Sequence, residues 1–555
     1  MFGSLAAMRP LHTLRHLPAL LALALLAACA APAPPGPAAR PRLVVFLAVD
    51  GLPQRQVLDY RDQLAPDGLA RFLDRGAWFA NANYGHAHTV TAAGHAVMLT
   101  GAYPERTGII GNNWRDPVTL ADQYCTADAS ATYIGNSTKP LDGTSPKNLM
   151  AETVGDVLRR GDARSKVIAI SGKDRGAILP GGKTGTAYMY MDESGQFASS
   201  TYYMAQHPAW VDAFNAAKPA DRYFKTAWTA LLPEAAYARS LPDGQKWFAR
   251  GVGKLPRMMG AEADLAPGNS YYNGLRASPF IDALSLDFAR AAIRGEALGQ
   301  DDAPDILAVS LSGHDYVNHA FSAESRLSHD HVLQLDRMLQ AFLSDLDATV
   351  GKDNYIAVLT ADHGFMPAPE YSQSLGRDAG RVNVSQLLAR LNAGLEPRFG
   401  AGKWVSQYGA QNLLFDRKLA AGVDRVALAE ATRQLLLAEP FVAAAYTHQE
   451  QLTNSRAGAP LFEQMRKAFH PQVSGDIAFA LKPYWMFTSS SAATHGSPYP
   501  YDSQVPILLY GPQWFKPGRI DTAVEVVDIA PTLSRILGIA APASSQGRLL
   551  PLVAP

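Results

Sequence analysis

Short apolar runs alternate with longer amphipathic segments along most of the chain. The run at 43–49 (LVVFLAV) has the length of a β-strand and the unbroken apolar character of a strand covered on both faces. Similar runs occupy 166–170, 305–311, 355–359 and 505–510. Segments with helical periodicity lie at 148–160, 330–346, 382–392, 423–438 and 527–537. This alternation predicts an α/β fold with a mostly parallel central sheet and helices on both of its faces.

Two long tracts depart from the alternating pattern. The first, at about 188–278, is rich in Tyr, Trp and Pro, and the second spans about 367–490. We expect both to be insertions that build a cap over the sheet edge. The predicted globular domain therefore covers 42–555, with these two cap segments inserted into it.

The N-terminus has the pattern of an export signal. Basic residues including Arg9 and Arg15 precede a short apolar stretch at 17–26 (LPALLALALL). The stretch ends in LAAC at 26–29, which resembles the lipobox of bacterial lipoproteins, whose cysteine is acylated after cleavage. The resemblance implies a signal peptide at 1–28 and a lipidated Cys29. The alternative is an ordinary cleaved signal peptide in which this cysteine is incidental.

The residues after Cys29 predict a tether. Segment 30–41 (AAPAPPGPAARP) is too rich in Pro and too poor in large apolar residues to pack as a regular element. We therefore interpret 29–41 as a lipidated cysteine with a Pro/Ala tether, and expect an exported protein, either periplasmic or a membrane-anchored lipoprotein. Membrane contact is then expected only through Cys29. If Cys29 is lipidated, Cys125 remains as a free thiol and no intrachain disulfide can form.

Composition excludes several classes of protein. The 555 residues carry 50 basic and 50 acidic side chains, and this balance argues against a non-specific nucleic-acid binder. Two cysteines exclude a disulfide scaffold and a Cys-rich metal array. Beyond the N-terminus, no stretch approaches the roughly 20 apolar residues of a membrane span. A large folded enzyme or receptor remains, which we expect to be monomeric.

Acidic residues and histidines follow three of the predicted strands. Asp50 comes directly after the first strand, Asp315 and His319 follow another, and Asp362 with His363 follows a third. Ligands of open α/β sheets bind beyond the carboxyl ends of the strands, so we expect these groups to converge. Asp315 and His319 share one face of a helical turn because they are four residues apart. His495 lies in a loop before the last strong strand and could join them.

The donor types in this group favour a metal site. A single Asp after a strand is usually a turn former or a helix N-cap, and a single His is usually a structural residue. Their coincidence at three strand ends favours a metal centre instead. Oxygen and imidazole donors without thiolate suit Zn²⁺, Mn²⁺ or Fe.

Thr91 supplies a candidate nucleophile. It opens the segment TAAGH, which precedes an apolar helical run. A Thr at a helix start is commonly an N-cap. Alternatively, it could act as a nucleophile if a metal holds its hydroxyl, since the hydroxyl has no useful anionic fraction at neutral pH. Spacing alone does not separate the two interpretations.

Seven ordered motifs together resemble the alkaline phosphatase superfamily, most closely its phosphate-irrepressible alkaline phosphatases with a threonine nucleophile. The motifs are VDG at Asp50, TAAGH at Thr91, GIIGNNW at Asn112, SGKDR at Lys173 and Arg175, DYVNH at Asp315 and His319, ADHG at Asp362, and THGSPYPYD at His495. They are spread along nearly the whole mature chain. Ala93 stands where the family often has Pro, a change that removes no functional group.

The resemblance implies a site with two Zn²⁺ ions. One ion would be held by Asp315, His319 and His495, and the other by Asp50, Thr91, Asp362 and His363. Charge counting is consistent with this assignment, because three carboxylates and a threonine alkoxide balance the four positive charges of two Zn²⁺. A neutral centre avoids the cost of uncompensated buried charge.

The resemblance also implies an activity, namely broad-specificity hydrolysis of phosphate monoesters through a covalent phosphothreonine at Thr91. Asn112, Lys173 and Arg175 would hold the non-bridging phosphate oxygens. Lys173 and Arg175 favour a dianionic monoester over a singly charged diester. A phosphodiesterase or nucleotide pyrophosphatase on the same scaffold is the enzymatic alternative, and a surface-anchored phosphate-binding or adhesion protein is the non-catalytic one.

Three other patterns are set aside. Residues 177–184 (AILPGGKT) fit a loose P-loop pattern, but the following residues are β-like and no helix is expected at Thr184. His86 and His88 form an H-x-H motif with no counterpart in the family, and we interpret them as loop residues. His314 lies next to Asp315 and could support it.

Overall fold

The structure is a computed structural model that describes residues 1, 40–249 and 253–553. The predicted signal peptide, Cys29 and nearly all of the tether lie outside the described residues. In the described part, no helix is both long and apolar enough to cross a membrane. Cys125 is buried and free.

A nine-stranded sheet organises the described part of the domain, in the order β20-β2-β19-β12-β1-β11-β6-β7-β8. Five adjacent strands of this sheet are mutually parallel. They are β12 (Tyr355–Thr360), β1 (Leu43–Val49), β11 (Asp305–Leu311), β6 (Val167–Ser171) and β7 (Thr186–Met191). The edges are mixed, because β19 (Ile507–Tyr510) pairs antiparallel with β12 and with β2 (Ala77–Phe79), and β8 (Gln196–Ala198) pairs antiparallel with β7. β20 (Gly518–Ile520) pairs parallel with β2. The predicted α/β fold with a mostly parallel sheet is confirmed.

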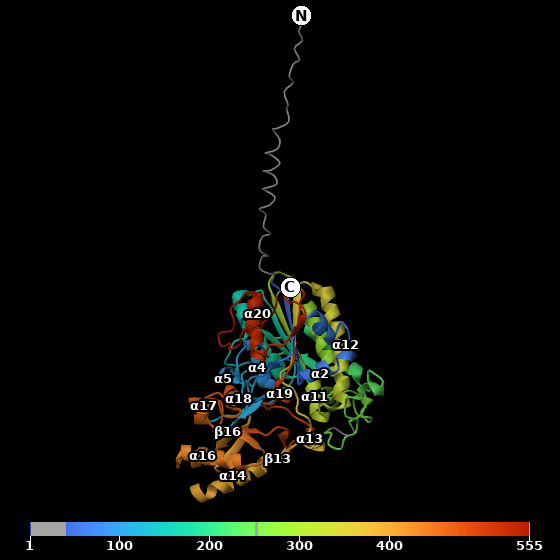
Figure 1. Cartoon of the computed structure of the whole chain (residues 1–555). Helices are drawn as coiled ribbons and strands as arrows, with labels where there is room; N and C mark the ends of the chain where they lie inside the picture. Colours follow the sequence, from blue (N-terminus) through green and yellow to red (C-terminus); the bar gives the residue numbers. More distant parts are fainter. Residues whose placement is uncertain (2–39, 250–252, 554–555) are drawn as a thin grey trace. The chain divides into compact units, whose positions relative to one another are not determined.

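Helices cover both faces of this sheet, which explains the unbroken apolar runs. All seven residues of β1 and all seven of β11 are buried. α10 (Pro279–Gly295) packs on β11 and β6 together with α12 (Arg326–Leu346), while α7 (Asp174–Gly181) packs on β6 and β7 together with α4 (Thr91–Thr100). Figure 1 shows α12 and α4 on either side of the central strands.

Two predicted boundaries are wrong. The helix expected at 148–160 begins only at Val154, as α6 (Val154–Gly161), because the Thr153 side chain accepts the Asp156 N–H and forms a capping box. The tract expected to be an insertion from about residue 188 starts inside the central sheet. Tyr188 and Phe197 belong to β7 and β8 and are buried in the main core.

Hydrogen bonds hold residues 228–237 of the first tract on α12. The buried carboxylate of Asp330 accepts hydrogen bonds from Trp228 Nε1 at 2.6 Å, from Leu231 N at 2.7 Å and from Tyr237 Oη at 2.5 Å. Three donors satisfy this buried charge and hold the tract on the helix.

The second tract folds around a core of its own. It contains a four-stranded sheet in the order β14-β15-β17-β16. These strands are β14 (Val405–Gly409), β15 (Asn412–Phe415), β17 (Ile477–Leu481) and β16 (Val442–Thr447). Apolar faces of α14 (Val384–Phe399) and α16 (Arg425–Ala438) complete this core, which includes Leu387 and Leu428. That the two tracts act as caps stays a prediction.

The loose P-loop pattern has the wrong local order. Most of 177–184 lies in α7 or in the turn after it, and the strand β7 follows at Thr186. A P-loop requires a strand before the loop and a helix after it. This segment therefore lacks the geometry that cradles a nucleotide phosphate.

Candidate active site

Three adjacent strands bring the predicted ligands to one edge of the sheet. β1 lies between β11 and β12, and all three are parallel. Asp50 follows β1, Asp362 and His363 follow β12, and Asp315 lies in α11 (Gly313–Phe321), which begins after β11. The Gly51 N–H donates to Asp362 Oδ1 at 2.9 Å and ties two of these strand ends together.

One group of side chains gathers around Asp315. His319 Nε2 lies 3.3 Å from Asp315 Oδ1, as expected for residues one helical turn apart. His495 comes from the loop before β19, and its Nε2 lies 3.5 Å from the same oxygen. Both histidines predicted to bind the same ion as Asp315 therefore face one oxygen of its carboxylate.

A second group gathers around Asp50 and Asp362. His363 Nε2 lies 3.5 Å from Asp50 Oδ1 and 3.4 Å from Asp362 Oδ2. The His363 and His495 rings stack with centroids 3.4 Å apart, so the two groups are in contact. Ligand atoms within 4.8 Å of one another define two clusters, Asp50–Asp362–His363 and Asp315–His363–His495. His363 thus belongs to both clusters and His319 to neither. The family resemblance instead implies that His319 binds one ion and that His363 binds only the other.

The three imidazoles share one orientation. Their Nδ1 atoms face backbone carbonyls, at 2.9 Å for His363 and Gly364 O, 3.1 Å for His319 and Ala493 O, and 2.9 Å for His495 and Thr89 O. Because a carbonyl oxygen can only accept, we assign the proton to Nδ1 in each ring. Each Nε2 therefore presents a lone pair toward the carboxylates, the arrangement found in metal-binding histidines.

Burial and neighbouring charges shift the pKa values of the carboxylates in opposite directions. Burial and the neighbouring Asp362 raise the pKa of Asp50 well above its usual value. Burial also disfavours ionised Asp315, but His319 and Lys173 outweigh it and hold the pKa of Asp315 well below its usual range. Within the described residues, Asp315 Oδ1, Asp362 Oδ2 and His363 Nε2 are buried without a hydrogen bond. Orphaned oxygen and imidazole donors of this kind fit divalent cations.

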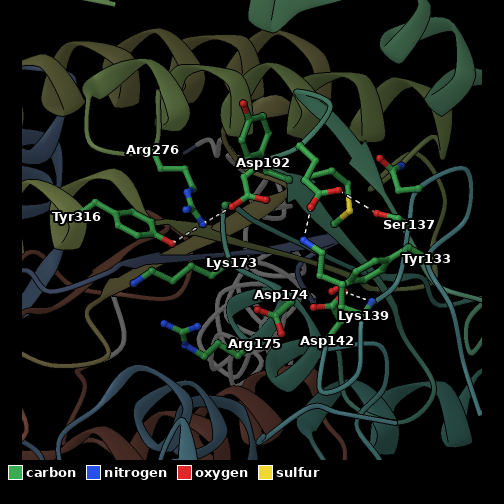
Figure 2. Close-up of a pocket in the computed structure, with 15 residues that line it drawn as sticks. Tyr133, Ser137, Lys139, Asp142, Lys173, Asp174, Arg175, Asp192, Arg276 and Tyr316 are labelled. Carbon is green, nitrogen blue, oxygen red and sulfur yellow. Dashed lines mark hydrogen bonds and ion pairs between the residues drawn. The ribbon is translucent and has the colours of Figure 1, made fainter. Parts of the chain in front are cut away.

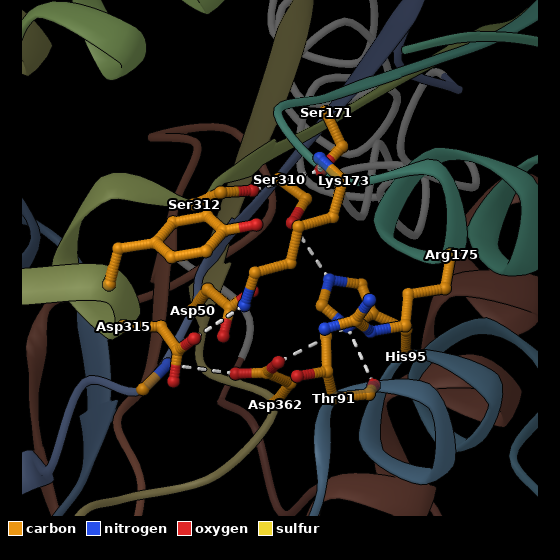
Figure 3. Close-up of polar contacts among 12 residues, drawn as sticks. Asp50, Thr91, His95, Ser171, Lys173, Arg175, Ser310, Ser312, Asp315 and Asp362 are labelled. Atoms are coloured by element: carbon orange, nitrogen blue, oxygen red, sulfur yellow. Dashed lines mark hydrogen bonds and ion pairs between the residues drawn. The ribbon is translucent and has the colours of Figure 1, made fainter. Parts of the chain in front are cut away.

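Lys173 connects the two clusters. It precedes α7, and its Nζ lies 2.7 Å from Asp50 Oδ2 and 2.6 Å from Asp315 Oδ2 (Figure 3). Burial opposes the charged ammonium, but the carboxylates of Asp315 and Asp50 overcome this and raise the pKa of Lys173 above its ordinary value. The side chain is therefore a fixed cation at the centre of the site.

Arg175 is oriented by residues that the sequence did not single out. Its Nη1 donates to Tyr124 Oη at 3.2 Å, and that hydroxyl donates to Asp174 Oδ1 at 2.7 Å. Asp174 also accepts from Thr126 Oγ1 at 2.9 Å. Tyr124 lies some 50 residues before Arg175, and no spacing signal connects them.

Thr91 and Asn112 meet at the start of α4. Val90 occupies the N-cap position, and no side chain caps the helix, so the N-cap interpretation of Thr91 is wrong. Thr91 is the first helical residue and is 1% exposed. The Ala92 N–H donates to Asn112 Oδ1 at 2.8 Å, and the Asn112 amide group keeps its N–H donors for another partner.

His95 is a site residue that the sequence analysis missed. Its Nδ1 lies 2.8 Å from the Thr91 carbonyl oxygen and 3.3 Å from Asp362 Oδ2. Its Nε2 lies 2.8 Å from Ser310 Oγ on β11. His95 thus connects α4, which begins at Thr91, to β11 and to the end of β12. Its position four residues after Thr91, on the same helical face, was the available signal.

His86, His88 and His314 lie outside both clusters. His88 Nδ1 contacts Ile110 O at 2.8 Å, and His86 is buried without a hydrogen bond in the described part of the chain. His314 does not turn toward the ligands, because it contacts Gln56 Oε1 at 2.8 Å and His331 Nδ1 at 3.2 Å.

Comparison with known proteins identifies the family. Residues 44–499 match the family model described as type I phosphodiesterase / nucleotide pyrophosphatase. The chain is 35% identical to alkaline phosphatase PhoV of Synechococcus elongatus, with 92% of each chain covered. It is 34% identical to alkaline phosphatase PafA of Elizabethkingia meningoseptica, covering 92% of this chain and 94% of PafA.

A solved structure agrees with the sequence comparison. The crystal structure of wild-type alkaline phosphatase PafA superposes with a TM-score of 0.86 at 31% identity, covering 93% of this chain and 99% of that one. The resemblance inferred from the seven motifs is therefore confirmed over the whole folded domain. The chain belongs to the type I phosphodiesterase / nucleotide pyrophosphatase family of the alkaline phosphatase superfamily, together with relatives named alkaline phosphatases.

Proposed function

We propose that this protein hydrolyses phosphate monoesters, with Thr91 as the nucleophile. One observation carries the proposal: the Thr91 helix start and the Lys173 ammonium lie beside Asp50, Asp315 and Asp362 (Figure 3). These carboxylates belong to the two carboxylate–imidazole clusters at the ends of β1, β11 and β12. The relatives named alkaline phosphatases support the same activity.

We further propose that the clusters hold two Zn²⁺ ions. Asp50, Asp362 and His363, with the Thr91 hydroxyl, would bind one. Asp315, His319 and His495 would bind the other, and His363 stands between the two groups. When bound, the ions would lower the pKa of the Thr91 hydroxyl and stabilise the negative charge of the departing ester oxygen.

The side chains of this site suit a two-step displacement. The Thr91 oxygen attacks phosphorus, the phosphorus–ester oxygen bond breaks, and the alcohol leaves with a proton while phosphothreonine forms. Water then attacks the same phosphorus, breaks its bond to the Thr91 oxygen and releases inorganic phosphate. Lys173 and Arg175 offset the charge of the non-bridging oxygens, and Asn112 donates to one of them.

Two fixed cations favour a monoester dianion over a diester anion. Turnover of p-nitrophenyl phosphate should therefore exceed turnover of bis-p-nitrophenyl phosphate by several orders of magnitude at alkaline pH. Replacing both Lys173 and Arg175 by Ala should reduce monoester turnover far more than diester turnover. A wild-type preference for the diester would instead support the phosphodiesterase alternative.

We also propose that the chain is exported, lipidated at Cys29 and monomeric. Intact-mass measurement of protein from membranes of the producing bacterium should show an acylated N-terminus at Cys29. Cys29→Ser should move the activity from the membrane to the soluble fraction. Wild-type activity that is already soluble would support simple cleavage, and light scattering of the soluble variant checks the oligomeric state.

A further inference from the structure

A cavity of about 210 Å³ opens from the phosphate-binding end of the site. Lys173 and Arg175 line one end of it, and Asp192 and Arg276 line the other (Figure 2). The Tyr316 ring connects the two ends, because Lys173 Nζ lies 4.8 Å and the Arg276 guanidinium carbon 5.0 Å from its centroid. A group attached to a phosphate held by Lys173 and Arg175 can therefore extend into this cavity.

The cavity is polar but balanced in charge. Its four carboxylates, on Asp142, Asp174, Asp192 and Glu193, are matched by four cations on Lys139, Lys173, Arg175 and Arg276. The far end is an ion pair, with Arg276 Nη1 2.9 Å from Asp192 Oδ2. A second charged group on the ligand would meet no unpaired charge there, and an apolar group would leave these polar atoms desolvated.

The far end keeps free hydrogen-bonding capacity of both kinds. Arg276 Nη1 is also 3.2 Å from Tyr316 Oη, and Asp192 Oδ2 also accepts from Asn273 Nδ2 at 3.2 Å. In the described part of the chain, Arg276 Nη2 and Asp192 Oδ1 have no such partner, so a donor and an acceptor remain on adjacent, held side chains. Neighbouring hydroxyl groups of a sugar need this combination, since each hydroxyl both donates and accepts.

Aromatic rings complete the cavity wall. Tyr133 Oη donates to Gly143 O at 2.9 Å and Tyr190 Oη donates to Tyr272 O at 3.2 Å, and these bonds fix both rings. Fixed aromatic rings offer contact surface for the C–H groups of a sugar at little entropic cost. The wall thus combines the two features that suit a polyhydroxylated ring.

We propose that this cavity is a subsite for the sugar of a sugar phosphate, with Asp192 and Arg276 as its specificity-determining residues. The inference rests on the proposed phosphatase function and names the substrate class within it. The phosphoryl group would lie at Lys173 and Arg175, and the sugar hydroxyls at Asp192 and Arg276. Alkyl phosphates would use the first pair only.

The test compares two substrates of similar shape on the zinc-loaded enzyme. Glucose 6-phosphate carries ring hydroxyls, and cyclohexylmethyl phosphate has a ring of similar size without them. Asp192→Asn should lower kcat/KM for glucose 6-phosphate about tenfold and leave that for cyclohexylmethyl phosphate within about twofold. Comparing each variant with wild type cancels the difference in reactivity between the two esters. Asp521→Asn, at an exposed carboxylate 73% accessible, is the matched control and should change neither.

A binding measurement separates this inference from the proposed activity. In a Thr91→Ala background, calorimetry should show that Asp192→Asn weakens glucose 6-phosphate binding by a similar factor and leaves cyclohexylmethyl phosphate unaffected. Equal effects on both ligands, or none on either, would overturn the sugar subsite. If the wild-type enzyme hydrolyses neither ester, the proposed function itself fails, whatever the binding data show.

Discussion

Lys173 forms ion pairs with two buried carboxylates of the site, those of Asp50 and Asp315. Its ammonium lies within 2.7 Å of carboxylates from two different strand ends. The same group is proposed to face the phosphate, so it both offsets the acidic ligands and contributes to substrate recognition. The neighbouring carboxylates of Asp315 and Asp50 explain why this lysine can be buried without losing its proton.

The role of Thr91 leads to the first prediction. Thr91→Ala should lower kcat for p-nitrophenyl phosphate at least about a thousandfold, because it removes the proposed nucleophilic hydroxyl. Thr91 is the first residue of α4, and its hydroxyl is the one at this helix start. Thr91→Ser keeps a hydroxyl and should retain measurable activity. Circular dichroism and zinc content should match wild type in both variants; activity of Thr91→Ala near the wild-type value would show that the nucleophile lies elsewhere.

Tyr124 offers a second prediction at this scale. Tyr124→Phe removes the hydroxyl that joins Arg175 to Asp174, and it should lower monoester kcat/KM about fivefold, with most of the loss in KM. The diester rate should change less, because its charge is smaller. Tyr202→Phe, at a half-exposed tyrosine bonded to Lys183 O, is the control. Equal losses on both esters would argue against a role through Arg175.

At the scale of elements, α11 matters because it carries Asp315 and His319. A buried carboxylate anchors the first residue of α11, because the Gly313 N–H donates to Asp282 Oδ1 at 2.9 Å. Asp282 belongs to α10, and its Oδ2 also lies 3.2 Å from His331 Nε2 on α12. The Asp282 carboxylate therefore connects three helices, α10, α11 and α12.

This junction predicts a stability effect. Asp282→Ala leaves the Gly313 N–H buried without an acceptor and should lower the free energy of unfolding by about 1–3 kcal/mol. Urea unfolding of the metal-free protein measures it. Asp282→Asn keeps an acceptor and should recover part of the loss. Asp287→Ala, at a partly exposed carboxylate on the same helix, should cost less than about 1 kcal/mol. An equal loss at both positions would contradict this role of Asp282.

Much of this arrangement of elements could be predicted from the sequence. The strands at 43–49 and 305–311 were placed correctly because buried parallel strands have unbroken apolar runs, and their ligands follow directly. The residues of β7 were expected to be β-like, but their place in the central sheet was missed because TAYMYM mixes polar and aromatic residues near the sheet edge. The contacts of His95 and Tyr124, and the stacking of His363 on His495, join distant segments that no local period encodes.

The molecule as a whole should lose stability in acid through buried neutral histidines. Burial, with a contribution from Arg239, lowers the pKa of His329 to about 4, whereas an unfolded His titrates near 6.5. Between these values the unfolded chain binds the extra proton, so stability falls as pH decreases from 7 to 5. For His329 the loss is about 1–2 kcal/mol.

His329→Gln should remove that part of the pH dependence. Gln can keep a contact with Gln63, which the His329 Nε2 approaches at 2.6 Å. Urea unfolding at pH 7 and pH 5 should show a smaller difference for the variant than for wild type. Identical differences would mean that folding leaves the pKa of His329 unchanged.

Metal binding should also stabilise the whole domain. If the clusters bind Zn²⁺, EDTA should lower the thermal midpoint, because ligand at about 1,000 times its Kd contributes about 4 kcal/mol. Calorimetry with and without EDTA measures the shift, and Asp362→Asn should reduce it. A midpoint that EDTA leaves unchanged would count against ion binding in the folded state.

The spread of the cluster residues along the chain also has a consequence for biogenesis. Asp50 follows the first strand of the sheet, while His495 arrives from a loop shortly before β19. A growing polypeptide that has not yet emerged as far as His495 therefore cannot complete the cluster around Asp315. If activity requires both of the proposed ions, a product terminated before His495 would stay inert even with abundant metal, and the second ion would bind only after nearly the whole chain has been made.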